Sequence, residues 1–139
     1  MDKKTAILLI EDDEVDIMNV QRAFKKNSFQ NPLYIANNGL EALALLRGDG
    51  RPALNPAPKI ILLDINMPKM GGIEFLQQLR SDKLLRSISV FVLTTSNEDC
   101  DKIAAYNLNV AGYILKPVSF ERFVQALGTL GAYWDLCQR

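Results

Sequence analysis

Five short runs of apolar residues recur along the chain, each bounded by turn-forming or charged residues. A short unbroken apolar run of this kind is typical of a strand that is buried on both faces of a sheet. The pattern therefore predicts five buried strands, at residues 5–10, 32–36, 59–64, 89–94 and 111–115.

The stretches between these runs carry apolar residues at intervals of three and four positions, the spacing of one helix face. They predict helices at residues 15–26, 40–46, 73–80 and 97–107, with the weakest pattern in the last of these. A final helix is expected to begin at Ser119, whose hydroxyl suits a helix N-cap. Its apolar stripe consists of Phe120, Phe123, Val124, Leu127, Leu130 and Trp134.

Five alternations of strand and helix predict the fold class. They indicate an α/β protein with a doubly wound, five-stranded parallel sheet and helices on both faces. Residues 48–58 hold two Gly and three Pro and predict a long surface loop. The length of 139 residues suits one domain, so we expect a single domain over residues 1–139 with no output domain.

Composition and charge narrow the possible functions. Lys plus Arg and Asp plus Glu both number 16, and this balance argues against non-specific nucleic-acid binding. No apolar run approaches the length of a membrane span, and acidic residues directly after the first run argue against a signal peptide, so we expect a cytoplasmic protein. The chain has no histidine, which excludes histidine bases, ligands and phosphohistidine relays. Cys100 and Cys137 have no metal-ligand spacing and are expected to be free thiols.

Polar side chains gather where the predicted strands end. In an open α/β sheet, ligands bind just beyond the carboxyl ends of the strands. The residues at those ends are Glu11, Asp12 and Asp13, then Asp64, then Thr94, then Lys116. A lone acid after a strand is usually a helix N-cap. The whole set instead predicts one site at which several carboxylates, a hydroxyl and an ammonium group meet.

Clustered carboxylates repel one another, and a divalent cation removes that conflict. Mg²⁺ suits a site with oxygen ligands only, because it takes one or two carboxylates together with waters and phosphate oxygens. The sequence therefore predicts a magnesium and phosphate site at this edge of the sheet.

Four motifs resemble those of the response-regulator receiver domains. They are Ile10-Glu11-Asp12-Asp13, Leu63-Asp64-Ile65-Asn66-Met67-Pro68 with Gly71-Gly72, Leu93-Thr94-Thr95, and Tyr113-Ile114-Leu115-Lys116-Pro117. The resemblance covers nearly the whole chain and implies a flavodoxin-like receiver fold. It also implies a two-component switch that catalyses its own aspartyl phosphorylation and dephosphorylation, rather than an enzyme that turns over a separate substrate.

The resemblance implies roles for individual residues. Asp64 would accept the phosphoryl group, Asp12 would bind Mg²⁺ directly and Glu11 mostly through water, and the backbone carbonyl of Asn66 would be a further metal ligand. At the phosphoryl group itself, the implied partners are Thr94 and Lys116. In the same frame Asp13 falls one place past the metal pair, so its expected role is the N-cap of the first helix.

Tyr113 is the expected switch aromatic. The resemblance implies that Thr94 swings toward the phosphoryl group and that Tyr113 then turns inward. The alternative is that Tyr113 is simply a half-buried aromatic of the sheet.

Residues 48–58, residues 93–99 and Tyr133-Trp134 resemble a narrower group, the single-domain regulators that partner bacterial phytochrome histidine kinases. This resemblance implies a sensor histidine kinase, a phytochrome, as the partner and phosphoryl donor. It also implies a homodimer through the last helix, with Tyr133, Trp134 and Leu136 at the interface. The alternative is that Trp134 folds back onto its own sheet.

Two rival functions remain beside the phosphorylation switch. A pseudo-receiver would be a protein-binding scaffold that has lost phosphotransfer, and the complete set of site residues argues against it. A flavodoxin-type cofactor protein would need a phosphate-cradling loop after the first strand, where this chain has acids.

Overall fold

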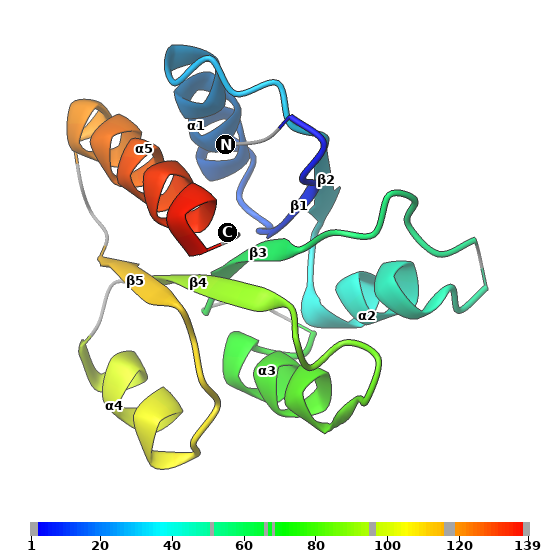
Figure 1. The fold of residues 1–139 in the computed structure, drawn as a ribbon. Coiled ribbons are helices and arrows are strands. Elements are labelled where there is room, and N and C mark those ends of the chain that lie inside the picture. Colours follow the sequence, from blue (N-terminus) through cyan, green and yellow to red (C-terminus); the bar gives the residue numbers. More distant parts are fainter. Residues whose placement is uncertain are drawn as a thin grey trace.

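The structure is a computed structural model that describes residues 3–50, 52–65, 67, 69–94, 97–115 and 119–137. Within these ranges five strands alternate with five helices (Figure 1). The strands are β1 (Ile7–Ile10), β2 (Leu33–Ala36), β3 (Ile60–Asp64), β4 (Ser89–Thr94) and β5 (Gly112–Leu115). The helices are α1 (Glu14–Lys26), α2 (Gly39–Arg47), α3 (Gly72–Ser81), α4 (Asn97–Ala105) and α5 (Phe120–Cys137). The predicted alternation is confirmed.

The strands form one parallel sheet in the order β2-β1-β3-β4-β5, so the chain winds outward in both directions from β1 and β3. Helices α1 and α5 cover one face, and α2, α3 and α4 cover the other (Figure 1). The predicted doubly wound α/β fold is confirmed. Among the described residues, no helix has both the length and the apolar character that crossing a membrane requires.

Two apolar cores lie on the two faces of the sheet. Successive strand residues point to opposite faces, so Leu8 and Ile10 pack under α2 and α3, while Ile7 and Leu9 pack under α1 and α5. All four side chains are at most 1% exposed. Burial on both faces explains why the strands appear in the sequence as unbroken apolar runs.

Local side-chain and backbone features determine where the helices begin and end. Asn38 caps α2, because its side chain accepts a hydrogen bond from the Glu41 N–H at 2.8 Å. Gly48, in the left-handed conformation at φ 78°, ends α2. Helix α4 ends at Ala105 and is therefore shorter than the predicted span of residues 97–107. Asn107, two residues later, has a positive φ of 60°. The expected N-cap Ser119 accepts a hydrogen bond from the backbone N–H of Arg122 at 3.2 Å.

Helices α1 and α5 meet at a polar contact within their apolar face. The Asn27 side-chain amide donates to the carbonyls of Ala23 in α1 and Val124 in α5, at 3.1 and 3.0 Å. A Cβ atom on Gly128 would lie 2.8 Å from the Asn27 Oδ1, so this glycine is what lets the amide approach α5. Packing therefore offsets the helix propensity that glycine costs at this position.

Trp134 corrects one expectation from the sequence. It lies four residues after Leu130 and therefore extends the buried stripe of α5, and it is only 7% exposed. The predicted place of Trp134 at an interface is wrong for the surface that this chain presents, and the alternative, packing against its own sheet, is what the structure shows. Tyr133 and Leu136 point elsewhere on α5 and are 51% and 64% exposed.

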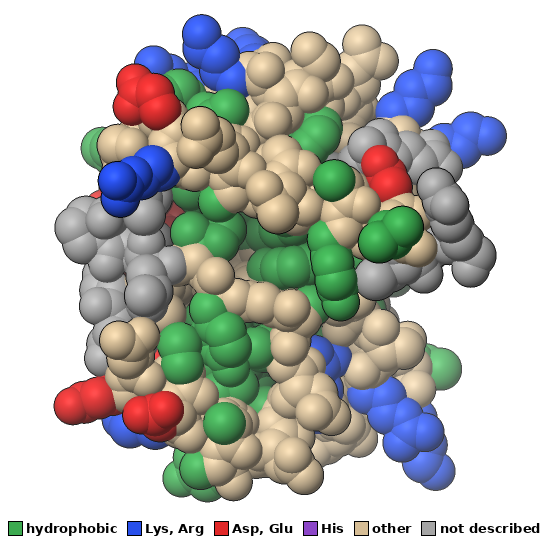
Figure 2. All heavy atoms as spheres, turned by 60° about the vertical axis from the view of Figure 1, so that its left-hand side comes forward, with side chains coloured by type: hydrophobic (Ala, Val, Ile, Leu, Met, Phe, Trp, Pro, Cys, Tyr) green, Lys and Arg blue, Asp and Glu red, His purple; other side chains and the backbone are tan. Residues whose placement is uncertain are grey.

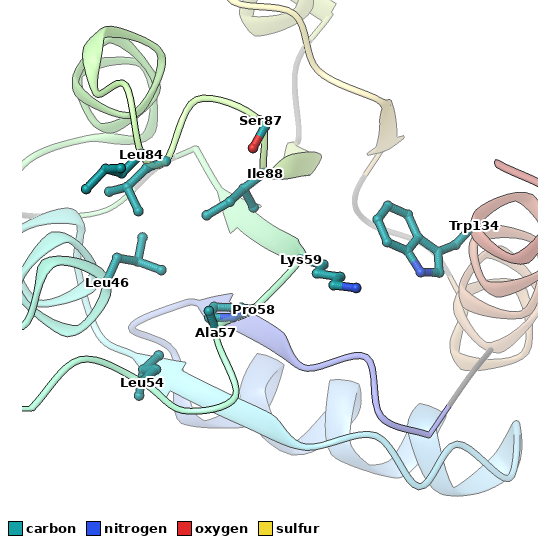
Figure 3. Close-up of a pocket in the computed structure, with 10 residues that line it drawn as sticks. Leu46, Leu54, Ala57, Pro58, Lys59, Leu84, Ser87, Ile88 and Trp134 are labelled. Carbon is teal, nitrogen blue, oxygen red and sulfur yellow. The ribbon is translucent and has the colours of Figure 1, made fainter. Parts of the chain in front are cut away.

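The indole of Trp134 projects from α5 toward a cavity of about 410 Å³ at the amino end of the sheet (Figure 3). Leu46 and Leu54 line the opposite side, and the Lys59 side chain extends toward the indole. The cavity is therefore remote from the carboxyl ends of the strands, where ligands of such sheets bind.

Arg80 joins α3 to the loops that precede β4 and β5. Its guanidinium donates four hydrogen bonds to backbone carbonyls, at 2.8 Å to Arg86, 2.8 Å to Ile88, 2.8 Å to Leu108 and 2.6 Å to Asn109. Burial lowers the pKa of Arg80 from its usual value. The planar fork of five N–H groups allows one side chain to satisfy all four acceptors.

We predict that Arg80→Lys lowers the free energy of unfolding by about 1–3 kcal/mol, because an ammonium has three donors and leaves at least one of these carbonyls unpaired. Urea denaturation followed by circular dichroism measures the change. The matched control is Arg86→Lys, since the Arg86 side chain is exposed. Equal stability of the two variants contradicts the role given to Arg80.

Candidate functional site

Three carboxylates meet at the carboxyl ends of β1 and β3. Glu11 and Asp12 directly follow β1, and Asp64 is the last residue of β3. The two strands are parallel neighbours with Ile10 opposite Leu63, so their ends lie side by side. Carboxylate oxygens of the three residues all lie within 4.8 Å of one another. Glu11 and Asp64 are buried, and Asp12 opens to the surface.

Backbone hydrogen bonds orient the Glu11 carboxylate. Its Oε1 accepts from the N–H groups of Asp12 and Asp13, both at 3.1 Å, as the chain turns from β1 into α1. Charge-assisted bonds of this kind hold a buried carboxylate in one position. Glu11 is therefore a fixed part of the cluster.

Asp13 points away from the cluster and caps α1, as expected. Its Oδ1 accepts from the N–H groups of Val15 at 2.8 Å and Asp16 at 3.2 Å. Three acids in a row thus divide into two site residues and one helix cap.

The donor set fits Mg²⁺. It consists of oxygen atoms only, its carboxylates are close enough to repel one another, and one side is open to water and phosphate. Glu11, Asp12 and Asp64 are the described residues that would hold the ion. When bound there, the ion supplies positive charge that neutralises carboxylate and phosphoryl oxygens.

Thr94 lies beside this cluster at the end of the neighbouring strand. Asp64 pairs with Leu93 across β3 and β4, and the N–H of Ile65 donates to the Leu93 carbonyl at 3.2 Å. Thr94 is 1% exposed, and its hydroxyl donates to Oδ2 of Asp99 at 2.5 Å. Sequence reasoning placed Thr94 here but gave no role to Asp99, although the acid stands in the first turn of the next predicted helix.

Gly72 allows the chain to fold tightly after β3. A Cβ atom at this position would lie 2.7 Å from both the Cα and the Cδ1 of Ile65, and the Gly72 N–H donates to the Ile65 carbonyl at 3.0 Å. Lys69 and Met70 have positive φ angles of 50° and 68° in the same loop. The loop after the phosphoacceptor candidate therefore depends on glycine where it begins α3.

Two predicted site residues, Asn66 and Lys116, lie outside the described residues, so their roles stay predictions. Tyr113 is described, and it is 40% exposed on the edge strand β5. It pairs with Val92, two residues before Thr94, so the strand alternation places it on the same face of the sheet as Thr94. Burial and the nearby Cys100 raise the pKa of Tyr113. This placement is compatible with both the switch role and the half-buried alternative.

Comparisons of sequence and of structure with known proteins point to the same family. The sequence model of the response regulator receiver domain family matches residues 7–128. The response regulator Rcp1 of Synechocystis sp. is 36% identical over 128 residues, which cover 92% of this chain and 87% of Rcp1. The crystal structure of the phosphorylated cyanobacterial phytochrome response regulator RcpA has a TM-score of 0.83 and 34% identity, and 94% of each chain is covered.

A second solved structure, the Mn²⁺-bound form of response regulator Rcp1, has a TM-score of 0.77 at 34% identity and covers 94% of each chain. That structure holds a divalent cation in a related receiver, which agrees with the acidic cluster of this chain. The family match spans both strands that carry the cluster. The chain therefore belongs to the response regulator receiver domains, the components of two-component signalling whose partners are histidine kinases.

Proposed function

We propose that this protein is switched by Mg²⁺-dependent transfer of a phosphoryl group to Asp64. The observation that carries the proposal is the meeting of Glu11, Asp12 and Asp64 at the carboxyl ends of two adjacent strands. Such a cluster is costly without a cation and suits one cation plus one phosphate, which is the requirement of phosphoryl transfer.

The transfer forms one bond and breaks one. A carboxylate oxygen of Asp64 attacks phosphorus, the bond between phosphorus and the kinase histidine nitrogen breaks, and that nitrogen keeps the electron pair and later takes a proton. A carboxylate is a weak nucleophile, so positioning and charge neutralisation carry most of the catalysis. Glu11 and Asp12 would hold the cation, and Lys116, in the role that the family resemblance implies, would add its positive charge at the phosphoryl group. Attack of water on the aspartyl phosphate returns the resting state.

The proposed donor is a histidine kinase of the bacterial phytochrome type. This chain has no histidine, so the phosphohistidine belongs to another chain. The similar protein RcpA is named as a cyanobacterial phytochrome response regulator, and that name supports the same kind of partner here. The cytoplasm is the proposed location, where a kinase finds ATP.

The proposed output is contact with proteins, a second copy of this chain among them, rather than with nucleic acid. Figure 2 shows apolar side chains gathered in a hollow on the face that carries the edge of the sheet. This hollow has a volume of about 330 Å³, lies between β5 and α5, and includes Tyr113 and Tyr133. Leu136 adds an exposed apolar side chain further along α5. Zero net charge also favours protein contacts over nucleic acid.

We predict that acetyl phosphate with Mg²⁺ adds one phosphoryl group to the wild type and none to Asp64→Asn, because the amide is not a nucleophile. Intact-protein mass spectrometry measures the change. The control, Asp82→Asn, alters an acid of the α3–β4 loop and should be phosphorylated as the wild type is. A wild type that takes up no phosphoryl group indicates a pseudo-receiver scaffold, and equal uptake by Asp64→Asn contradicts the assignment of Asp64.

We predict that Asp12→Asn weakens Mg²⁺ binding by about tenfold or more, since it removes a ligand charge. Asp13→Asn is the matched control, because it removes the same charge one residue away and asparagine still caps α1. Calorimetric titration with Mg²⁺ compares the two. Equal losses in both variants contradict the division of the acids into ligands and cap.

We predict that the protein forms a dimer and that Tyr133→Ser or Leu136→Ser weakens it about tenfold, since each removes exposed apolar surface. Trp134→Ala is expected to lower the free energy of unfolding by about 3–5 kcal/mol instead, because the indole is core. Size-exclusion chromatography with light scattering measures mass, and urea denaturation measures stability. A monomeric wild type at high micromolar concentration, with and without acetyl phosphate, contradicts the dimer.

A further inference from the structure

One short hydrogen bond joins the site to a helix. The Thr94 hydroxyl donates to Oδ2 of Asp99 at 2.5 Å, and Asp99 stands in the first turn of α4. This distance is that of a charge-assisted O–H···O⁻ bond. A threonine hydroxyl has a single proton and can donate it to one acceptor only. While the bond to Asp99 exists, that proton is not available to another oxygen.

A second acceptor competes for the same proton. Thr94 ends the strand beside Asp64, and a phosphoryl oxygen on Asp64 is the acceptor expected for its hydroxyl. We propose that Asp99 is a positioning residue that holds the Thr94 hydroxyl in the resting state, and that the phosphoryl group must displace it. The inference rests on the proposed function of Asp64 and concerns a residue to which that function gives no role.

Displacement has a consequence for α4. Once Thr94 donates to the phosphoryl group, the Asp99 carboxylate has lost this donor and faces a new charge of about −1.5 to −2. Like charges at short range repel. The first turn of α4 thus loses an attachment and gains a repulsion in the same event.

Helix α4 is held weakly enough for this to matter. Ile103 is its one buried residue, whereas α3 buries Gly72, Phe75, Leu76 and Leu79. Elements with few buried apolar contacts open at low free-energy cost. The Thr94–Asp99 bond is therefore a substantial part of what keeps the amino end of α4 on the sheet.

The other end of α4 is anchored. Arg80 binds the carbonyls of Leu108 and Asn109 just after the helix, at 2.8 and 2.6 Å. Leu108 itself is 5% exposed. Release of Asp99 would thus let α4 pivot about its carboxyl end rather than leave the sheet.

Hydrogen exchange of the resting protein tests the Thr94–Asp99 bond directly. Asp99→Ala and Thr94→Val each remove one end of the bond, and both should speed exchange of the amides at residues 97–105 by about tenfold. Asp101→Ala is the matched control, because it removes an exposed acid from the same helix and should leave exchange much closer to the wild type. Asp99→Asn retains an acceptor and should restore part of the protection. Equal exchange in the wild type, Asp99→Ala and Thr94→Val overturns the proposal.

Binding of beryllofluoride with Mg²⁺ tests the competition. This phosphoryl mimic should bind Asp99→Ala about three- to tenfold more tightly than the wild type, since no Thr94–Asp99 bond has to be broken. The gain should vanish when Asp99→Ala is placed in the Thr94→Val background, and Asp101→Ala should show little gain. A gain in affinity that persists without the Thr94 hydroxyl overturns the proposed role of Asp99. A wild type that does not bind beryllofluoride contradicts the proposed function itself, a result that the exchange experiment cannot produce.

Discussion

The repulsion among three carboxylates is the constraint on which the site depends. Parallel pairing of β1 and β3 places Glu11 and Asp64 at one edge of the sheet, and Asp12 follows Glu11 directly. Backbone N–H groups fix Glu11, and Asp64 is buried, so these two carboxylates have little freedom to move apart. A cation and a phosphoryl group are the partners that resolve this conflict, and Asp12 opens the cluster to the surface.

The fold was predictable because its signals are local and strong. Apolar runs and helical spacing located all five strands and all five helices within the described ranges, and the strand ends located Glu11, Asp12 and Asp64. The division of the acids followed from the family resemblance, in which Asp13 falls one place past the metal pair, where the first helix begins. The family resemblance rested on the same residues, and the family match over residues 7–128 confirms it.

Contacts between distant residues were not predictable in the same way. The apolar spacing of α5 included Trp134, and its neighbours Tyr133 and Leu136 were also compatible with an interface. The packing of the structure decides between core and interface, since Trp134 is buried and its two neighbours are exposed. The bond from Thr94 to Asp99 joins the end of β4 to the first turn of α4, and no periodicity encodes such a contact. The approach of Asn27 to Gly128 likewise joins the first helix to the last.

The parallel order of the strands has a thermodynamic consequence. The halves of the acidic cluster come from segments that are far apart in the chain and meet only when β1 pairs with β3. The unfolded chain therefore lacks the converged site, and a cation that binds the cluster binds the folded state preferentially. By mass action, such a ligand raises the free energy of unfolding as its concentration rises above its dissociation constant. Magnesium bound at the cluster would therefore also stabilise the pairing of β1 with β3, which brings the carboxylates together.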